Sequence, residues 1–171
     1  MFDGCFAVWS CDANNGGVIL DGVHEIDYLC WLFGPTCSVV SDSGRLGNFD
    51  IAAEDYSGII LRHGAGIRSE IHLDYLRRVK RRGCEISGTD GLIDWISEGK
   101  SPENCHVRQF TPARGWVTLM NEQDVGFGKP LASVMKAFVD ALNGDQTDLQ
   151  TGYEAREVLR TALIARDGNM D

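Results

Sequence analysis

The first long pattern in the chain is helical. Apolar side chains recur at steps of four and three from residue 19 to residue 33, and this stripe consists of Ile19, Val23, Ile26, Cys30 and Phe33. A repeat of this kind is typical of a helix with one face on a core. Gly34 and Pro35 end the pattern, because glycine often terminates helices and proline cannot continue one.

Strand-like segments follow, separated by glycine, aspartate, asparagine and proline. They cover residues 37–46, 54–63, 66–75, 82–88, 91–97, 104–110 and 115–119. The third shows the alternation best, since Ile67, Ile71 and Leu73 share one face and charged side chains share the other. Because most joins between these segments are short, we expect antiparallel pairing.

Two further helical stripes close the chain, over residues 131–142 and 155–165. Strands followed by helices indicate an α+β fold, here an open, predominantly antiparallel sheet with helices packed on one face. Leu92 and Ile96 would lie on one face of their strand, and Ile93 and Trp95 on the other. We therefore expect a second subunit to cover the open face, which makes the protein a homodimer.

Composition agrees with a single compact domain. The chain has 171 residues, of which 43% are hydrophobic and 24% charged, enough for a buried core. We assign residues 15–171 to this domain and leave 1–14 as a segment of unclear role. No apolar run approaches the roughly 18 residues of a membrane span, and no basic, apolar leader opens the sequence. The sequence thus predicts a cytoplasmic protein without a membrane partner.

The net charge of −9 argues against a nucleic-acid partner, because phosphate binding depends on clustered Lys and Arg. Five basic residues nevertheless crowd into positions 77–82: Arg77, Arg78, Lys80, Arg81 and Arg82. They are either a solvated loop or charge-protected edge strand, or a basic lip for an anionic substrate such as a nucleotide-sugar diphosphate or a sugar carboxylate.

Neither the cysteines nor the histidines are spaced as metal ligands. The six cysteines include no Cys-x-x-Cys pair, and the four histidines are scattered over residues 24–106. We therefore expect no metal site and no disulfide scaffold.

The polar side of the first helix carries the candidate chemistry. At about 100° per residue, Asp21, His24 and Tyr28 fall opposite the apolar stripe, with Glu25 and Asp27 beside them. A histidine among carboxylates suits general acid–base catalysis. An ordinary solvated helix face would have the same composition, so the pattern alone leaves both interpretations open.

Several motifs together resemble the C-terminal domain of the Gfo/Idh/MocA oxidoreductase family, named after glucose-fructose oxidoreductase and inositol dehydrogenase. They are the Gly16-Gly17 pair with the helix motif His24-x-x-Asp27, the strands at 54–61 and 66–73, and segments 73–78 and 84–93, which are similar to the branch acting on sugars and nucleotide sugars. The resemblance implies catalytic roles for Asp21 and His24. It also implies substrate contacts by Asp27, Tyr75, Arg77 and Arg78.

One spacing departs from the family pattern. The acid of this motif commonly stands four residues before the histidine, whereas Asp21 stands three before His24. Residues three and four apart both lie on the same helix face, so the substitution of one spacing for the other preserves the arrangement.

The other half of such an enzyme, a Rossmann domain that holds NAD(P), has no counterpart in this sequence. A dinucleotide fingerprint needs Gly-x-Gly-x-x-Gly, and neither Gly64-Ala65-Gly66 nor Gly126-Phe127-Gly128 continues that way. The family's catalytic Glu-Lys-Pro lysine is also missing, since Gly128-Lys129-Pro130 is read as the start of a helix. We expect no cofactor in this chain, and NAD(P) only with a Rossmann partner domain.

These observations predict the substrate-binding and oligomerisation domain of an NAD(P)-dependent sugar or nucleotide-sugar oxidoreductase, inactive on its own. The alternatives are a stand-alone sugar-binding module and a non-catalytic assembly domain. Because hydride transfer needs the cofactor beside the substrate, the sequence leaves open whether the protein is an enzyme.

Overall fold

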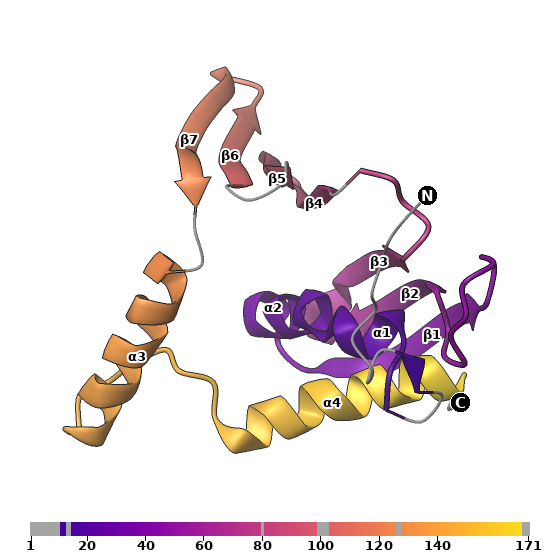
Figure 1. Ribbon diagram of the computed structural model, residues 1–171. Helices are drawn as coiled ribbons and strands as arrows, with labels where there is room; N and C mark the ends of the chain where they lie inside the picture. Colours follow the sequence, from indigo (N-terminus) through magenta and orange to yellow (C-terminus); the bar gives the residue numbers. More distant parts are fainter. Residues whose placement is uncertain (1–10, 13–14, 80, 99–102, 126–127, 169–171) are drawn as a thin grey trace. The chain divides into compact units, whose positions relative to one another are not determined.

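The computed structural model describes residues 11–12, 15–79, 81–98, 103–125 and 128–168 (Figure 1). The chain divides into two compact units, the first formed by Met1–Leu76 with Gln150–Asp171 and the second by Arg77–Leu149. That residues 15–171 act as one domain stays a prediction. Trp9, Phe6 and Cys5 lie outside the described residues.

The first unit is a three-stranded antiparallel sheet with helices. Its elements are α1 (Val18–Asp21), α2 (Val23–Phe33), β1 (Thr36–Gly44), β2 (Tyr56–His63), the short helix η2 (Gly64–Gly66), β3 (Arg68–Asp74) and α4 (Gly152–Asp167), with strand order β1-β2-β3. The strand predictions at 37–46, 54–63 and 66–75 are confirmed to within a few residues. The predicted alternation of residues 67–73 holds within β3.

The predicted helix over residues 19–33 is interrupted at Gly22, which separates α1 from α2. A Cβ atom at Gly22 would lie 2.9 Å from a side-chain carbon of Leu73 on β3. The glycine therefore lets the helix break approach the sheet closely. The stripe still faces the core, because Ile19 and Ile26 are fully buried.

The core lies between the sheet and these helices. Ile59 and Leu61 on β2 are buried, whereas Ile60 between them is 42% exposed, so one face of the sheet is covered and the other is open. On the covered side α1 and α2 contact β3, α4 contacts β1, and α2 packs beside α4 (Figure 1).

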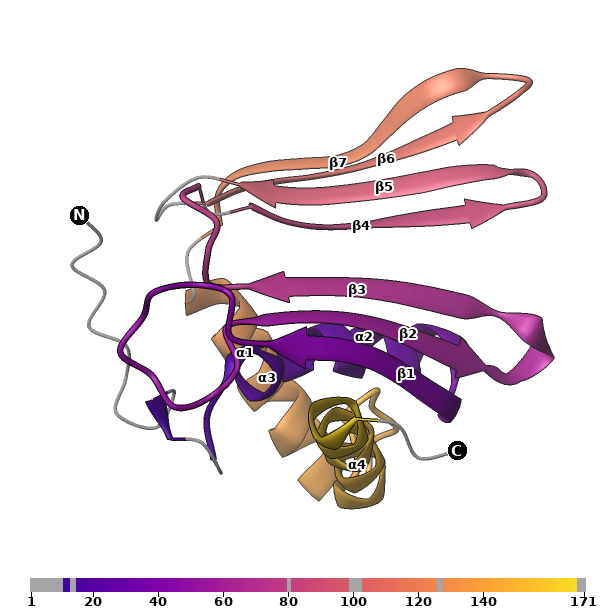
Figure 2. The same ribbon diagram turned by 90° about the vertical axis from the view of Figure 1, so that its right-hand side faces the viewer.

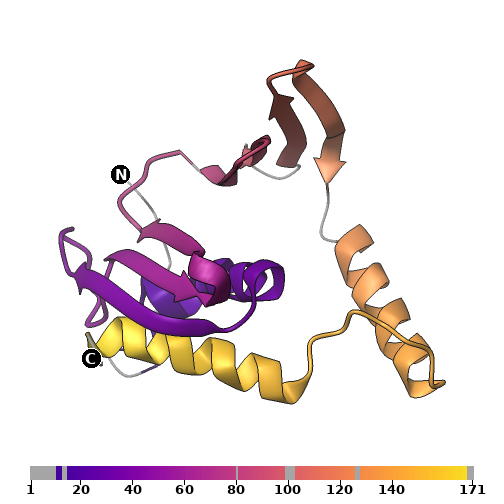
Figure 3. The same ribbon diagram turned by 180° about the vertical axis from the view of Figure 1, so that it is seen from behind.

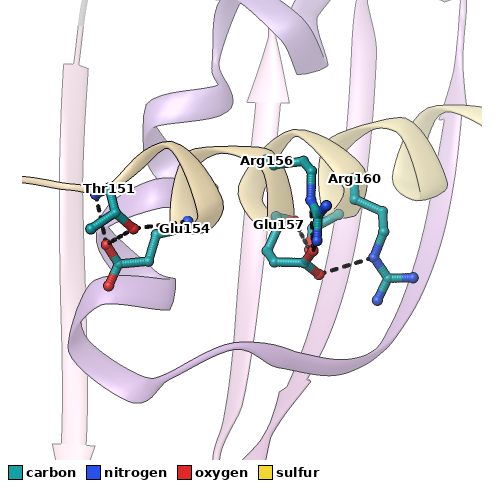
Figure 4. Close-up of polar contacts among 6 residues, drawn as sticks. Thr151, Glu154, Arg156, Glu157 and Arg160 are labelled. Carbon is teal, nitrogen blue, oxygen red and sulfur yellow. Dashed lines mark hydrogen bonds and ion pairs between the residues drawn. The ribbon is translucent and has the colours of Figure 1, made fainter.

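Helix α4 is tied to the sheet across a long stretch of chain. The hydroxyls of Thr36 and Thr161 are 2.7 Å apart, and Ser41 Oγ donates to the carbonyl oxygen of Ala165. A capping box begins the helix, with Thr151 and Glu154 bonding each other's backbone amides (Figure 4). This arrangement satisfies amides that the first helical turn leaves free.

The second unit contains a four-stranded antiparallel sheet and one helix. Its elements are β4 (Arg81–Gly88), β5 (Gly91–Glu98), β6 (Glu103–Thr111), β7 (Gly115–Val125) and α3 (Gly128–Leu142), with strand order β4-β5-β6-β7 (Figure 2). The α+β class with antiparallel sheets and helices is confirmed. The sequence predicts one sheet, and the described strands pair in two groups, β1–β3 and β4–β7.

Both faces of the β4–β7 sheet carry apolar side chains, as the sequence predicts. Ile93 is 37% exposed on one face, and Trp116 is 50% exposed on the other. Helix α3 (Figure 3) also exposes its predicted stripe, whose members are Leu131, Val134, Met135, Phe138, Val139 and Leu142. That a second subunit covers the open face stays a prediction.

Candidate functional site

The site is built where α1 begins, because Glu54 binds the start of that helix. Its backbone oxygen accepts from Val18 N at 3.0 Å, and its carboxylate oxygen Oε1 accepts from Ile19 N at 3.1 Å. Gly17 before the helix has φ 101°, and a Cβ atom there would lie 2.2 Å from the Glu54 carboxylate. The glycine thus supplies both an unusual backbone angle and the space for the carboxylate.

Asp55, the next residue, holds the loop between β1 and β2. Its carboxylate is buried and accepts from Leu46 N at 2.7 Å and from Gly47 N at 2.9 Å. Its backbone oxygen accepts from Tyr75 N at 2.9 Å. Asp55 therefore fixes the chain just after β3 as well as the loop.

Asp21 and Tyr75 meet at this place. The Tyr75 hydroxyl donates to Asp21 Oδ2 at 2.5 Å, although 54 positions separate the two residues. Asp21 is the last residue of α1 and is exposed. The structure thus brings together one predicted catalytic residue and one predicted substrate contact.

His24 lies three residues after Asp21, in the first turn of α2. Its side chain is 53% exposed, and Nε2 lies 3.5 Å from Glu25 Oε1, whose side chain is 11% exposed. When protonated, the imidazole forms an ion pair with this carboxylate. An exposed imidazole near Asp21 can exchange protons with a bound hydroxyl.

Asp27 has a structural partner. Its carboxylate accepts from Gln150 Nε2, just before α4. Burial raises the pKa of the Cys30 thiol on the next turn, and the charge of Asp27 raises it further. Asp27 therefore links α2 to the segment before α4.

Arg77 and Arg78 are exposed residues at the beginning of the second unit. Further along the basic run, Arg82 lies over the Trp95 ring, 5.5 Å from its centroid, and Arg81 is paired with Glu98 across the β4–β5 ladder. These two contacts agree with the charged edge strand, since β4 is an outer strand of its described sheet. A substrate-binding role for Arg77 and Arg78 stays a prediction.

Sequence reasoning missed Glu54 and Asp55, which it assigned to the start of a strand. Two adjacent acids before an apolar strand, together with a glycine pair before a short helix, are the signal that could have suggested capping. Of the other histidines, His63 is buried and uses both ring nitrogens on Gly34 O and Ser69 Oγ. His63 is therefore structural.

The first turn of α1 does not fit the pyrophosphate of a dinucleotide, because the Glu54 carboxylate already accepts from Ile19 N and the Glu54 backbone oxygen from Val18 N. Among the residues that the structure describes, no three His, Cys, Asp or Glu side chains converge as metal ligands would. Within the same residues, no helix combines the length and the apolar character that crossing a membrane requires.

Comparison with known proteins places this fold. A family model described as the GFO/IDH/MocA C-terminal domain matches residues 6–94. Biliverdin reductase from Synechocystis, solved with biliverdin and NADP+, has a TM-score of 0.73 and 12% identity over 96% of this chain and 50% of its own. UDP-N-acetylglucosamine 3-dehydrogenase from Acidithiobacillus ferrooxidans has a TM-score of 0.70 and 18% identity over 95% and 49%.

An oxidoreductase from Agrobacterium radiobacter, solved with NAD+, L-tartaric acid and magnesium, is also similar, with a TM-score of 0.62 and 15% identity over 85% of this chain and 44% of its own. The chain spans about half the length of these solved structures. At such identities the likeness shows the fold alone. No curated protein sequence matches the chain.

Proposed function

Because the chain belongs to the GFO/IDH/MocA C-terminal domain family, we propose that it is the substrate-binding part of an NAD(P)-dependent oxidoreductase that acts on a sugar or nucleotide sugar. The observation that carries the proposal is the Tyr75–Asp21 hydrogen bond of 2.5 Å, with His24 three residues further along. The name of the Acidithiobacillus enzyme supports the substrate class.

In this proposal His24 and Asp21 have different roles at a hydroxyl group of the sugar. His24 accepts the hydroxyl proton, and Glu25, 3.5 Å from its Nε2, pairs with the charged imidazole that results. The Asp21 carboxylate contacts the substrate in this proposal, and the hydrogen bond from Tyr75 fixes its orientation. Asp27 contributes a further acceptor beside Gln150.

Arg77 and Arg78 would bind the anionic part of the substrate, a diphosphate or a carboxylate. Guanidinium groups bind such anions through two parallel hydrogen bonds. Both residues are exposed, and they come two and three positions after Tyr75 in the sequence, which supports this role.

The dinucleotide in this proposal comes from a Rossmann domain, because this sequence has no Gly-x-Gly-x-x-Gly fingerprint. The described chain alone is then a binding domain without turnover. Two of the similar structures hold NAD+ or NADP+ and are about twice as long as this chain, which supports such an arrangement.

Binding of UDP-N-acetylglucosamine by the purified chain, measured by calorimetry, tests this function. We expect saturable binding that His24→Ala weakens about tenfold or more, the effect of losing a hydrogen bond to a charged group. His72→Ala is the matched control, because the His72 side chain is also 53% exposed and also lies beside a carboxylate, that of Asp74. Equal binding by wild type and His24→Ala contradicts the proposed site.

We also propose that the chain forms a homodimer through an open sheet face. The apolar residues of the β4–β7 sheet support this, since Phe110 is 36% and Trp116 50% exposed on the face that Leu92 shares. Analytical ultracentrifugation should show a dimer that Trp116→Glu dissociates. Trp31→Glu, at an exposed apolar residue of α2, should leave the dimer intact. A monomeric wild type, or a dimer that survives Trp116→Glu, refutes this interface.

The alternative is a non-catalytic assembly domain, which the exposed apolar side chains of the second unit favour. In that case the dimer persists and no nucleotide sugar binds.

A further inference from the structure

We propose that Glu54 and Asp55 are positioning residues that together hold Asp21 and Tyr75 in register. This inference rests on the function proposed for the Asp21–Tyr75 pair. Glu54 binds the start of the helix that carries Asp21, and Asp55 binds the backbone of Tyr75.

The contact of Glu54 with α1 sets the position of Asp21. The helix has only four residues, Val18–Asp21, so anchoring its first two amides leaves Asp21 less than one turn away. Glu54 supplies both acceptors, one from its backbone and one from its carboxylate. The N-cap residue Gly17 has no side chain that could cap the helix. The anchor is instead Glu54, which stands 35 positions after Ile19.

The contacts of Asp55 set the position of Tyr75. The bond from Tyr75 N to Asp55 O joins the end of β3 to the start of β2. The Asp55 carboxylate also holds the loop at Leu46 and Gly47. That loop packs beside the residue after Tyr75, because a Cβ atom at Gly47 would lie 2.7 Å from a side-chain carbon of Leu76.

The two anchors close a ring of contacts. Neighbouring carbonyl groups at residues 54 and 55 accept from Val18 and from Tyr75, and the Tyr75 hydroxyl returns to Asp21. A shift of either anchor therefore changes the distance between the phenol and the carboxylate. An isolated helix cap would stabilise α1 without this effect on Tyr75, and that difference can be measured.

Tyrosine-selective NMR of the full chain provides the measurement. The sequence has four tyrosines, so Tyr75→Phe assigns the Tyr75 ring signal. In Asp21→Ala the hydroxyl loses this acceptor, and the signal moves to a reference position. We expect Glu54→Ala to move it at least halfway toward that position, and Glu54→Gln to restore it, because an amide oxygen still accepts from Ile19 N.

Glu70→Ala is the control. Glu70 is an exposed glutamate on β3, on the face opposite the buried side chains of Ile71 and Leu73. It should leave the Tyr75 signal in place. Glu54→Asp keeps the charge but shortens the reach, and serves as the second variant if Glu54→Ala does not fold. An unmoved Tyr75 signal in a folded Glu54→Ala or Glu54→Asp protein overturns the inference.

Titration with UDP-N-acetylglucosamine separates this inference from the proposed function. If the ring signal responds to Glu54 but wild type binds no nucleotide sugar, the positioning stands and the substrate proposal fails. If wild type binds, Glu54→Ala should weaken the affinity several-fold and Glu54→Gln should recover it. Normal affinity in a folded Glu54→Ala protein counts against positioning of the binding site.

Discussion

The two units of the molecule bury their apolar side chains to very different extents. Among the described residues, every buried apolar side chain belongs to the first unit, including the fully buried Ile26, Ile59 and Leu61. In the part of the second unit that the structure describes, only Ser97 is buried, while Leu119 on β7 is 56% exposed. The first unit therefore contains a core of its own. The second carries the apolar surface that a core would need, without the burial.

The difference arises from what covers each sheet. Helices cover one face of β1–β3, and polar or charged side chains dominate the other. The β4–β7 sheet has apolar residues on both faces, and its ladder is reinforced by polar pairs such as Arg108 with Asp94. The comparison teaches that Asp21 and Tyr75 stand on the part of the chain with its own tertiary packing, which is where a precise site can be held.

Truncating one leucine in each sheet tests this comparison most strongly. Leu61→Ala should lower the free energy of unfolding by about 2–5 kcal/mol, because it leaves a cavity in a full core. Leu119→Ala should cost less than about 1 kcal/mol, as surface substitutions do. Urea unfolding measures both. A large loss for Leu119→Ala would break the comparison, since it would mean that β7 is covered in solution.

Two glycines sharpen the comparison at the level of the backbone. Gly17→Ala should cost about 2–3 kcal/mol, because φ is 101° and the new methyl group would meet the Glu54 carboxylate. Gly115→Ala, at φ 66° with no atom near the new Cβ, should cost about 1 kcal/mol from backbone strain alone. Thermal and urea unfolding of the two variants check this order. Equal losses would mean that the contact with Glu54 adds nothing.

The smallest effect concerns the helix that closes the first unit. The hydrogen bonds drawn in Figure 4 affect two glutamates. Bonds from Thr151 lower the pKa of Glu154 below its usual 4.5, and bonds from Arg156 lower the pKa of Glu157. A lowered folded-state pKa means that the unfolded chain binds protons more readily. The stabilisation is thus complete above the ordinary glutamate pKa and is lost as the pH falls through the folded-state value.

The measurement compares wild type with Glu154→Gln from pH 7 to pH 3. We expect the wild type to be more stable at pH 7 and the difference to shrink toward pH 3. In a Thr151→Ala background the difference should be smaller at every pH, because the cap that lowers the pKa is absent. A gap that does not narrow in acid contradicts the assignment.

Periodicity predicted most elements because their stripes are local. The alternation of Ile71 and Leu73 with polar and charged neighbours, and the helical stripe ending at Leu142, can be seen in a short window of the sequence. The break at Gly22 could not be seen, since it depends on the approach of Leu73 from another strand. The separation into two sheets likewise depends on pairing between strands.

The site was predictable only in part. The sequence singles out His24 and Asp21 because residues three apart share a helix face, whereas the structure interrupts that helix at Gly22 between them. Resemblance added Tyr75. The hydrogen bond between Tyr75 and Asp21 shows that these two residues meet, while their chemical roles stay predictions. Glu54 and Asp55 escaped because their contacts join α1, a loop and the end of β3, which no local pattern encodes.

The first unit is assembled from two stretches of sequence, and this has a consequence for the order of folding. Helix α4 reaches β1 through the contacts of Thr161 with Thr36 and of Ala165 with Ser41, across 125 and 124 positions. During synthesis the ribosome must complete all of Arg77–Leu149 before α4 can cover the sheet. Closure of so long a loop slows folding. Until α4 is synthesised, the apolar face of the nascent β1–β3 sheet therefore stays partly exposed. This is the stage at which a chaperone would bind the chain.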